Sequence, residues 1–490
     1  MNDPLILVLD EGTTSTRAML FGADGQPHGT AQRELTQFYP QPGWVEHDAA
    51  EIWDKTLACA KEMVAKAGGA EKIAAIGITN QRETVVAWDR QTGEPLCKAI
   101  VWQDRRTAAF CRELKQAGHE DKVRRKTGLL LDPYFSGTKM RWMLENDPAV
   151  ARAAEDGRLA FGTVESWLTF KLTGGLHKSD ASNASRTLLL ALDGGHFDPG
   201  LCELLGVPLA ALPEVVDTSG DLGATSPSIF GASIPICGMA GDQQAATIGQ
   251  GCLSPGDTKT TYGTGAFALT NIGSEPTISD NRLLTTVLYQ ISGEKAYAIE
   301  GSVFVAGSLV KWLRDSLGLI QSSAETEELA RSVEDNGGVV VVPALSGLGA
   351  PHWLPEARGL IDGLSFSTGK SHIVRAALEA MAHQTRDLAT AFAADGAEWT
   401  SLKVDGGMVA NDWMVQDIAD LLDLEVTRPA FIETTALGAA ILAAVGSGIH
   451  DDLQDAAEAM IGLTDSFAPQ MDGARRANRI ADWDRAIAKV

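Results

Sequence analysis

Short, mostly apolar runs that end at acidic or glycine-bearing turns recur through this sequence and limit the folds open to it. They occupy residues 5–9 (LILVL), 73–79 (IAAIGIT), 234–239 (IPICGM), 339–344 (VVVVPA) and 402–404 (LKV). Runs of this kind are typical of strands that are buried within a sheet. Longer segments with apolar residues at near-helical spacing lie at 49–66 and 372–392, and residues 260–270 have the pattern of a glycine-centred hairpin. The alternation predicts an α/β fold.

The chain has 490 residues, which is more than one hydrophobic core normally serves. We expect two large lobes, residues 1–248 and 249–490, with a cleft between them. Hydrophobic residues make up 44% of the chain, which is enough to form both cores without disulfides. The six cysteines form no C-x-x-C pair, so we expect reduced and mostly buried thiols.

The net charge of −23 argues against nucleic acids and anionic membrane surfaces as partners, because both require a basic stripe that the sequence lacks. A small phosphate ligand is compatible with this charge, since backbone N–H groups can bind it. The run at 5–9 has neither a basic flank nor a cleavage site, and residues 436–445 are shorter than the roughly 20 residues of a membrane span. We therefore expect a cytoplasmic protein that does not insert into membranes.

The turn after the first run, residues 10–17 (DEGTTSTR), has the composition of a phosphate-binding turn. Gly12 lets the backbone approach an anion, the threonines and the serine offer hydroxyl groups, and Arg17 adds a positive charge. Asp10 is suited to hold Mg²⁺ through water, because this ion prefers oxygen ligands. An ordinary polar hairpin would have a similar composition, so this turn alone does not decide between the two.

Two further turns favour the phosphate interpretation. Residues 262–265 (YGTG) and 405–411 (DGGMVAN) also place small residues beside expected strand ends. Three such turns, spread over both halves of the chain, fit a nucleotide that is held between two lobes. Residues 363–371 (GLSFSTGKS) come close to a Walker A loop but have one residue too many between the glycines. We expect Ser371 or Thr368 to cap the following helix instead.

Polar side chains suited to a small polyol follow two of the apolar runs. Arg82 and Glu83 come after the second run, and Asp242 and Gln243 come after the third. Each buried hydroxyl left without a partner costs about 1–3 kcal/mol, so a pocket for a triol needs several fixed donors and acceptors. The alternative is that Arg82 and Glu83 form a structural salt bridge and that Tyr134 only packs.

Taken together, these segments resemble the FGGY family of carbohydrate kinases over essentially the whole chain. Two family signatures occur in order, at 134–146 (YFSGTKMRWMLEN) and 359–379 (GLIDGLSFSTGKSHIVRAALE). Further segments are similar to family members that phosphorylate glycerol, namely 42–48 (PGWVEHD), 77–84 (GITNQRET), 132–139 (DPYFSGTK), 183–187 (NASRT), 241–246 (GDQQAA), 262–265 (YGTG) and 347–351 (GLGAP).

The resemblance implies two actin-like ATPase lobes of the ribonuclease H-like type that close over an interlobe cleft. It also implies transfer of a phosphoryl group from ATP to glycerol with Mg²⁺, in which Asp242 is the general base and lies with Asp10 near the metal. The other implied glycerol contacts are Arg82, Glu83, Tyr134, Gln243 and Trp102. The implied nucleotide contacts are Thr13, Thr14, Ser15, Arg17, Thr264, Gly307, Lys311, Gly407 and Asn411.

Three positions depart from the family pattern. Glu11 stands where many members have glutamine and is expected to add negative charge close to the phosphates. Lys311 also replaces a glutamine in the expected nucleotide site. Members controlled by fructose bisphosphate carry a basic residue before the third run, whereas residues 230–234 (FGASI) contain none, so we do not expect that control.

The sequence leaves three other functions open. One is a family kinase for another polyol or a ketose, such as erythritol or xylulose. Another is an actin-like nucleotide switch, which would share the phosphate turns but have no use for Arg82, Glu83 and Tyr134. The third is a catalytically silent nucleotide-binding relative, although retention of Asp10 and Asp242 weighs against it. The resemblance further implies a homodimer or a homotetramer.

Overall fold

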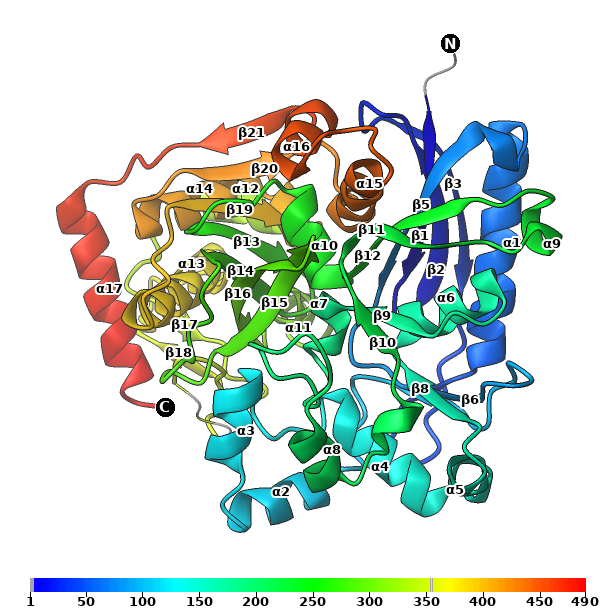
Figure 1. Ribbon diagram of the computed structural model, residues 1–490. Coiled ribbons are helices and arrows are strands. Elements are labelled where there is room, and N and C mark those ends of the chain that lie inside the picture. The colour runs from blue at the N-terminus through cyan, green and yellow to red at the C-terminus, as the bar shows by residue number, and fades with distance from the viewer. Residues whose placement is uncertain (1–3, 353, 355) are drawn as a thin grey trace.

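The computed structural model describes residues 4–352, 354 and 356–490. Figure 1 shows two halves side by side, with helices packed around a central twisted sheet. Within the described part of the chain, thirteen strands form this sheet in the order β21-β20-β19-β13-β14-β16-β15-β11-β12-β5-β1-β2-β3, where β21 is Thr464–Phe467. The α/β prediction is therefore confirmed.

The first half of the sheet begins with an antiparallel meander of β1 (Leu5–Glu11), β2 (Ser15–Phe21) and β3 (Pro27–Glu34). Next to β1 lies β5 (Ile73–Asn80), which runs parallel to it, and β12 (Pro235–Gly241) runs parallel to β5. The carboxyl ends of these three parallel strands meet at one edge of the sheet, which is where open α/β sheets bind ligands.

The second half repeats the arrangement. An antiparallel meander is formed by β13 (Asp257–Tyr262), β14 (Ala266–Gly273) and β16 (Glu294–Val303). The strands β19 (Ser401–Asp405) and β20 (Val426–Pro429) then run parallel to β13. Two copies of one strand order agree with the expected pair of actin-like lobes.

Two of the contacts between the halves lie near the middle of the sheet. One residue pair, Ser219 with Ile291, joins β11 (Ser219–Ala224) to β15 (Leu284–Ile291) in the sheet. Beside it, α10 (Asp242–Gly249) packs against α15 (Thr434–Gly446). A Cβ atom on Gly438 would lie 1.8 Å from the carbonyl oxygen of Ala245, so this close approach requires glycine.

The helix α15 also covers β12, β5 and β1, and its apolar side chains share a core with them. On the other face of that half, α1 (Ala49–Ala67) packs on β2 and β3. Asp48 caps α1 by accepting hydrogen bonds from the backbone N–H of Ala50 and Glu51. The second half is covered by α13 (Lys370–Ala394) and α14 (Asp412–Leu422).

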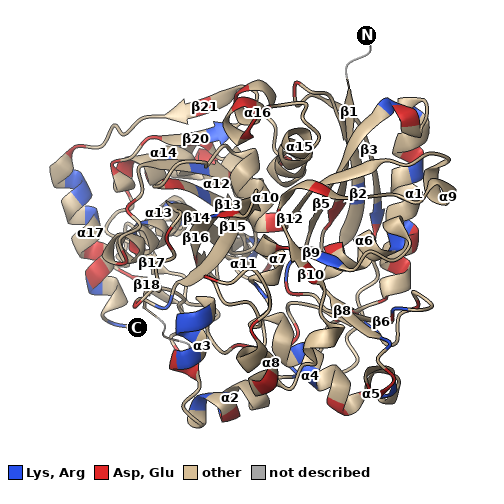
Figure 2. Cartoon of the chain, in the orientation of Figure 1, with Lys and Arg blue, Asp and Glu red and all other residues tan. Residues whose placement is uncertain are grey.

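Several of the remaining helices lie below the sheet in Figure 1, and α17 (Gly473–Ile487) lies along its outer edge. Those of the first half are α2 (Ala108–Gln116), α3 (Glu120–Thr127), α4 (Ser136–Asn146), α5 (Pro148–Glu155), α6 (Val164–Thr173), α7 (Ala181–Ala184), α8 (Pro199–Leu205) and α9 (Pro227–Phe230). Those of the second half are α11 (Gly307–Asp315), α12 (Glu325–Arg331), α16 (Leu453–Met460) and α17 (Gly473–Ile487). Figure 2 shows residues of both charges along the outer helices α1, α3 and α17, whereas the strands are largely uncharged.

All the strands, helices and the hairpin predicted from the sequence are present, with bounds shifted by a few residues. One local prediction is wrong. The cap of α13 is Gly369, not Ser371 or Thr368, and His372 Nδ1 accepts the backbone N–H of this glycine. The six cysteines, all within the described residues, are free thiols, and five of them are buried. Among the described helices, none combines the length and the apolar character needed to cross a membrane.

Candidate active site

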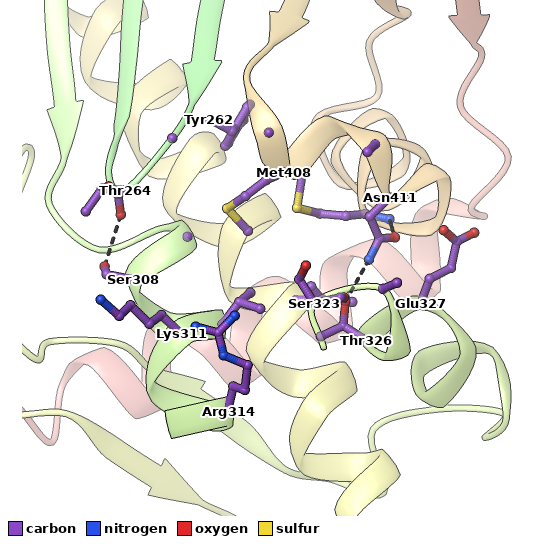
Figure 3. Close-up of a pocket in the computed structure, with 18 residues that line it drawn as sticks. Tyr262, Thr264, Ser308, Lys311, Arg314, Ser323, Thr326, Glu327, Met408 and Asn411 are labelled. Atoms are coloured by element: carbon purple, nitrogen blue, oxygen red, sulfur yellow. Dashed lines mark hydrogen bonds between the residues drawn. The ribbon is translucent and has the colours of Figure 1, made fainter. Parts of the chain in front are cut away.

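A cavity of about 650 Å³ lies in the second half, between α11, α12 and the turns that follow β13 and β19 (Figure 3). Five residues that were predicted to contact a nucleotide line it: Thr264, Gly307, Lys311, Gly407 and Asn411. Apolar side chains complete the wall, among them Val310, Met408 and Met414. The cavity therefore combines a surface suited to a flat, weakly polar ring with glycine-bearing turns suited to phosphates.

The glycine turns around this cavity allow close backbone approach. The N–H of Gly307 donates to the carbonyl of Gly263 at 2.9 Å, and a Cβ atom on Gly307 would lie 2.6 Å from that oxygen. Gly406 has a φ of +93°, which only glycine adopts readily. Asn411 caps α14 through its Oδ1 and donates from Nδ2 to Thr326 Oγ1 at 3.2 Å (Figure 3). These contacts hold both turns in place before a ligand arrives.

Lys311 and Arg314 lie side by side on α11 at the wall of the cavity in Figure 3. Arg314 pairs with its neighbour Asp315, with an N–O distance of 2.7 Å. Lys311 is exposed, and after Arg314 it contributes to lowering the pKa of Asp315. Its place at the wall of the cavity allows it to offer a positive charge to an anionic group there, and its contact with a nucleotide stays a prediction.

The other four predicted nucleotide contacts lie in the first half, in the turn between β1 and β2 and at the start of β2. Thr13, Thr14 and Ser15 lie at the turn, and Thr13 Oγ1 accepts a hydrogen bond of 2.9 Å from Trp102 Nε1. The side chain of Arg17 is held by two carboxylates. Its guanidinium donates to Asp10 and to Glu433, each at 2.5 Å, which ties the first turn to the segment before α15.

Asp10 lies in β1 and Asp242 follows β12, and β5 lies between these two strands. Across the sheet, Asp10 is paired with Thr79, and Thr79 is paired with Ala240, which lies two residues before Asp242. The backbone of Asp10 is therefore two strand spacings, or about 10 Å, from the backbone of Ala240. Burial raises the pKa of Asp10, and the guanidinium of Arg17 opposes this shift. No group of three or more His, Cys, Asp or Glu in the described chain is arranged to hold a metal ion. The two carboxylates of Asp10 and Asp242 fit a Mg²⁺ ion that is bound through water and substrate phosphates, because this ion keeps several of its waters.

Glu11 does not face the phosphate turn, so the expectation that it adds charge there is wrong. As the neighbour of Asp10 in β1, it points to the opposite face of the sheet, where it is fully buried. Its Oε1 accepts hydrogen bonds from the hydroxyl groups of Thr16 and Thr56. Burial raises the pKa of Glu11 to about 8, so the side chain is mostly neutral at pH 7.

Replacing Glu11 with glutamine should change how stability depends on pH. The folded protein holds a proton on Glu11 that the unfolded chain releases above about pH 4.3, so the wild type loses stability as pH rises from there to about 8. We expect Glu11→Gln to recover roughly 1–4 kcal/mol at pH 8 relative to pH 5. Urea unfolding at both pH values measures this, with Glu62→Gln on the exposed face of α1 as the control. An identical pH dependence in wild type and Glu11→Gln would contradict the neutral state.

The predicted glycerol contacts form a second cluster, centred on the guanidinium of Arg82. Its Nε lies 3.3 Å from Asp242 Oδ1, and its Nη2 donates to the hydroxyl of Tyr134 at 3.3 Å. Glu83 follows with a φ of +62°, an uncommon conformation for a residue other than glycine. Its carbonyl accepts hydrogen bonds from Ser136 and Lys139, which hold the strained turn in place.

Asp242 begins α10, directly after β12. Its side chain is 34% exposed, whereas the side chain of Arg82 is 2% exposed, so the carboxylate is the accessible member of the pair. Burial raises the pKa of Asp242 to about 6, and Arg82 opposes the shift. A carboxylate with this pKa is ionised at neutral pH and can still accept a proton, which suits a general base.

Trp102 and Tyr134 line a second cavity of about 600 Å³ that lies between the halves. Their rings make an edge-to-face contact with centroids 5.7 Å apart. The cavity also contains Phe267 and Glu300 from the second half. Gln243 is not among the residues that line it, and its Oε1 accepts a hydrogen bond of 2.6 Å from the buried Lys259.

Three charged residues of this cluster were not predicted from the sequence as site residues: Arg186, Lys259 and Glu300. Arg186 and Lys259 are fully buried, and Glu300 is 3% exposed. The segment 183–187 pointed to Arg186 only as part of a family resemblance. The residues next to Lys259 and Glu300 in the sequence do not indicate a site. A single charged residue within a strand is usually interpreted as a position that faces solvent.

Comparison with known proteins agrees with this geometry. Residues 5–249 match the N-terminal domain model of the FGGY family of carbohydrate kinases, and residues 258–447 match its C-terminal domain model. A glycerol kinase of Rhodospirillum rubrum is 55% identical in an alignment of 494 positions that covers 99% of this chain and 99% of that one. The crystal structure of Plasmodium falciparum glycerol kinase with ADP superposes with a TM-score of 0.95 at 35% identity, covering 99% of this chain and 98% of that one. A xylulose kinase structure from Rhodospirillum rubrum has a TM-score of 0.88 at 26% identity, covering 99% and 98%.

Proposed function

Because the chain belongs to the FGGY family of carbohydrate kinases, we propose that it transfers the terminal phosphoryl group of ATP to a hydroxyl of glycerol, giving glycerol 3-phosphate. The observation that carries the proposal is the position of Asp242. This accessible carboxylate contacts Arg82 beside Tyr134, at the strand ends where the two halves meet. We propose glycerol rather than another acceptor because relatives named glycerol kinase are 50–55% identical to this chain.

In the proposed reaction, Arg82, Glu83, Tyr134 and Gln243 bind the hydroxyl groups of glycerol, and the ring of Trp102 packs against its carbons. Asp242 orients the attacking hydroxyl and accepts its proton, and the new O–P bond forms as the bond to the leaving ADP oxygen breaks. Phosphoryl transfer depends mainly on alignment and charge neutralisation, because its transition state is loose. Closure of the lobes would exclude water and limit hydrolysis of ATP.

The nucleotide is proposed to occupy the cavity lined by Thr264, Gly307, Lys311, Gly407 and Asn411. Its phosphates would extend towards Thr13, Thr14 and Ser15, where Arg17 is already held between Asp10 and Glu433. Asp10 and Asp242 would hold Mg²⁺ through water, and the ion would neutralise charge on the phosphates. Arg17 would then act on the phosphates and on the orientation of Asp10 together.

The proposal includes three further properties. Residues 1–248 and 249–490 form the two lobes, the chain works in the cytoplasm where ATP is supplied, and it assembles as a homodimer or a homotetramer. Sedimentation of the purified protein would distinguish these two assemblies from a monomer.

A coupled assay of ADP release, with ATP, Mg²⁺ and glycerol, tests the proposed function. We expect release of ADP that depends on glycerol and on the metal. A panel with erythritol and xylulose addresses the other acceptors, and a higher kcat/KM for either would replace glycerol in the proposal. Turnover of ATP without any acceptor would support the nucleotide switch instead.

A further inference from the structure

We propose that Glu300 is a positioning residue that fixes the guanidinium of Arg82 in the acceptor site, so that the lobe carrying the nucleotide cavity completes the site for the polyol. This inference rests on the proposed function, because it concerns how the same site binds its acceptor. The residues predicted to contact glycerol all come from the first lobe. Glu300 would add a supporting residue from the second lobe.

The carboxylate of Glu300 joins two arginines that come from other parts of the chain. It projects from β16, in the second half of the sheet, and its two oxygens contact different partners. Oε2 lies 2.6 Å from Arg82 Nη1, and Oε1 lies 3.0 Å from Arg186 Nη2. Because each oxygen has its own guanidinium, neither arginine can turn without losing a charge-assisted hydrogen bond.

The four charges of this group balance one another. Arg186 Nε also donates to Glu83 Oε1 at 2.6 Å, so two cations alternate with two anions. The side chains of all four, Arg82, Glu83, Arg186 and Glu300, are 0–3% exposed. Burial by itself would raise the pKa of Glu300, but Arg186 and Arg82 lower it to about 2. The carboxylate is therefore ionised at neutral pH.

The contact with Glu300 decides where the other nitrogen atoms of Arg82 point. With Nη1 held by Glu300, Nε faces Asp242 and Nη2 faces the hydroxyl of Tyr134. These are the two groups proposed to meet the acceptor and its attacking hydroxyl. Glu300 itself lines the cavity that holds Trp102 and Tyr134, so it acts from the wall of the site.

Glu300→Gln keeps the shape of the side chain and removes its charge, which leaves Arg186 with Glu83 and Arg82 with the partly exposed Asp242. Since a hydrogen bond to a charged group contributes about 1.5–3 kcal/mol, we expect the KM for glycerol to rise by roughly 10–100-fold. The KM for ATP should stay within about threefold, because the nucleotide contacts are not touched. Calorimetric titration of glycerol into the protein with a non-hydrolysable ATP analogue should show the same loss of affinity.

The matched control is Asp417→Asn. Asp417 is also a buried carboxylate, and both its oxygens accept hydrogen bonds from Arg479, at 2.5 and 2.8 Å, between α14 and α17. Its loss should lower stability without changing the KM for glycerol. This comparison separates a positioning role from the general cost of breaking a buried ion pair.

Glu300→Asp covers the case in which the glutamine variant does not fold. The shorter side chain keeps the charge but cannot reach both arginines, so an increase in the KM for glycerol is again expected. A folded Glu300 variant with the wild-type KM for glycerol would overturn the inference, as would equal rises in the KM values of glycerol and ATP. A wild-type protein that releases no ADP with glycerol would instead contradict the proposed function.

Discussion

Asp242→Asn is expected to lower turnover by about 10²–10⁴-fold while the affinity for glycerol changes by less than about tenfold. Asparagine keeps the size of the side chain and can still contact Arg82, but it cannot accept the proton of the attacking hydroxyl. Steady-state kinetics for the ADP release, together with calorimetric binding of glycerol, measure both quantities. Wild-type kcat in the variant would remove Asp242 from the role of base.

The pH dependence gives a second measurement on the same residue. With the pKa of Asp242 raised to about 6, the carboxylate loses its function as a base when it is protonated. The wild-type kcat/KM for glycerol should therefore fall as pH drops through about 6, since this parameter reports the free enzyme. The matched control is Asp221→Asn, an exposed carboxylate on β11, which should keep both the rate and the profile.

Arg82→Ala is expected to raise the KM for glycerol by about 10²-fold or more and to change the KM for ATP far less. The substitution removes the partner of Glu300 and Asp242 at once, and it takes away the donor to Tyr134. Breaking a buried ion pair on one side costs about 3–5 kcal/mol, so the variant should also be less stable.

Two further variants separate these effects on Arg82. Arg479→Ala removes a comparably placed arginine from a buried pair with Asp417 and should lower stability alone. Arg82→Lys keeps the charge but cannot contact Glu300, Asp242 and Tyr134 together, so its KM for glycerol should still rise. An equal rise in the KM for both substrates would mean that Arg82 is only a structural ion pair.

Much of the fold was predictable because its signals are local. The runs 5–9, 73–79 and 234–239 became β1, β5 and β12, since an uninterrupted apolar run has few alternatives to a buried strand. The turns after these strands could also be located, because parallel strands deliver their carboxyl ends to one edge. The grouping of Thr264, Gly307 and Asn411 around one cavity follows from the same rule applied to the second half.

The sequence could not show which side of a strand a charged residue faces. Asp10 and Glu11 are neighbours, yet one contacts Arg17 at the expected site and the other is buried between two threonines. A shift of one residue in a strand moves every side chain to the opposite face of the sheet. Correct location of a turn in the sequence therefore does not show which of two adjacent residues faces the site. Only the packing of α1 against β2 settled it.

The amino-acid sequence by itself determined the strands, the glycine turns after them and the residues Arg82 and Asp242 that end two of them, since each depends on a few adjacent residues. Only the tertiary structure decided their partners. Glu300 follows Arg82 by more than two hundred positions, and Glu433 follows Arg17 by more than four hundred. Pairing over such separations is set by how the two halves of the sheet pack, because electrostatic contact requires a few ångströms and the distance along the chain carries no information about it.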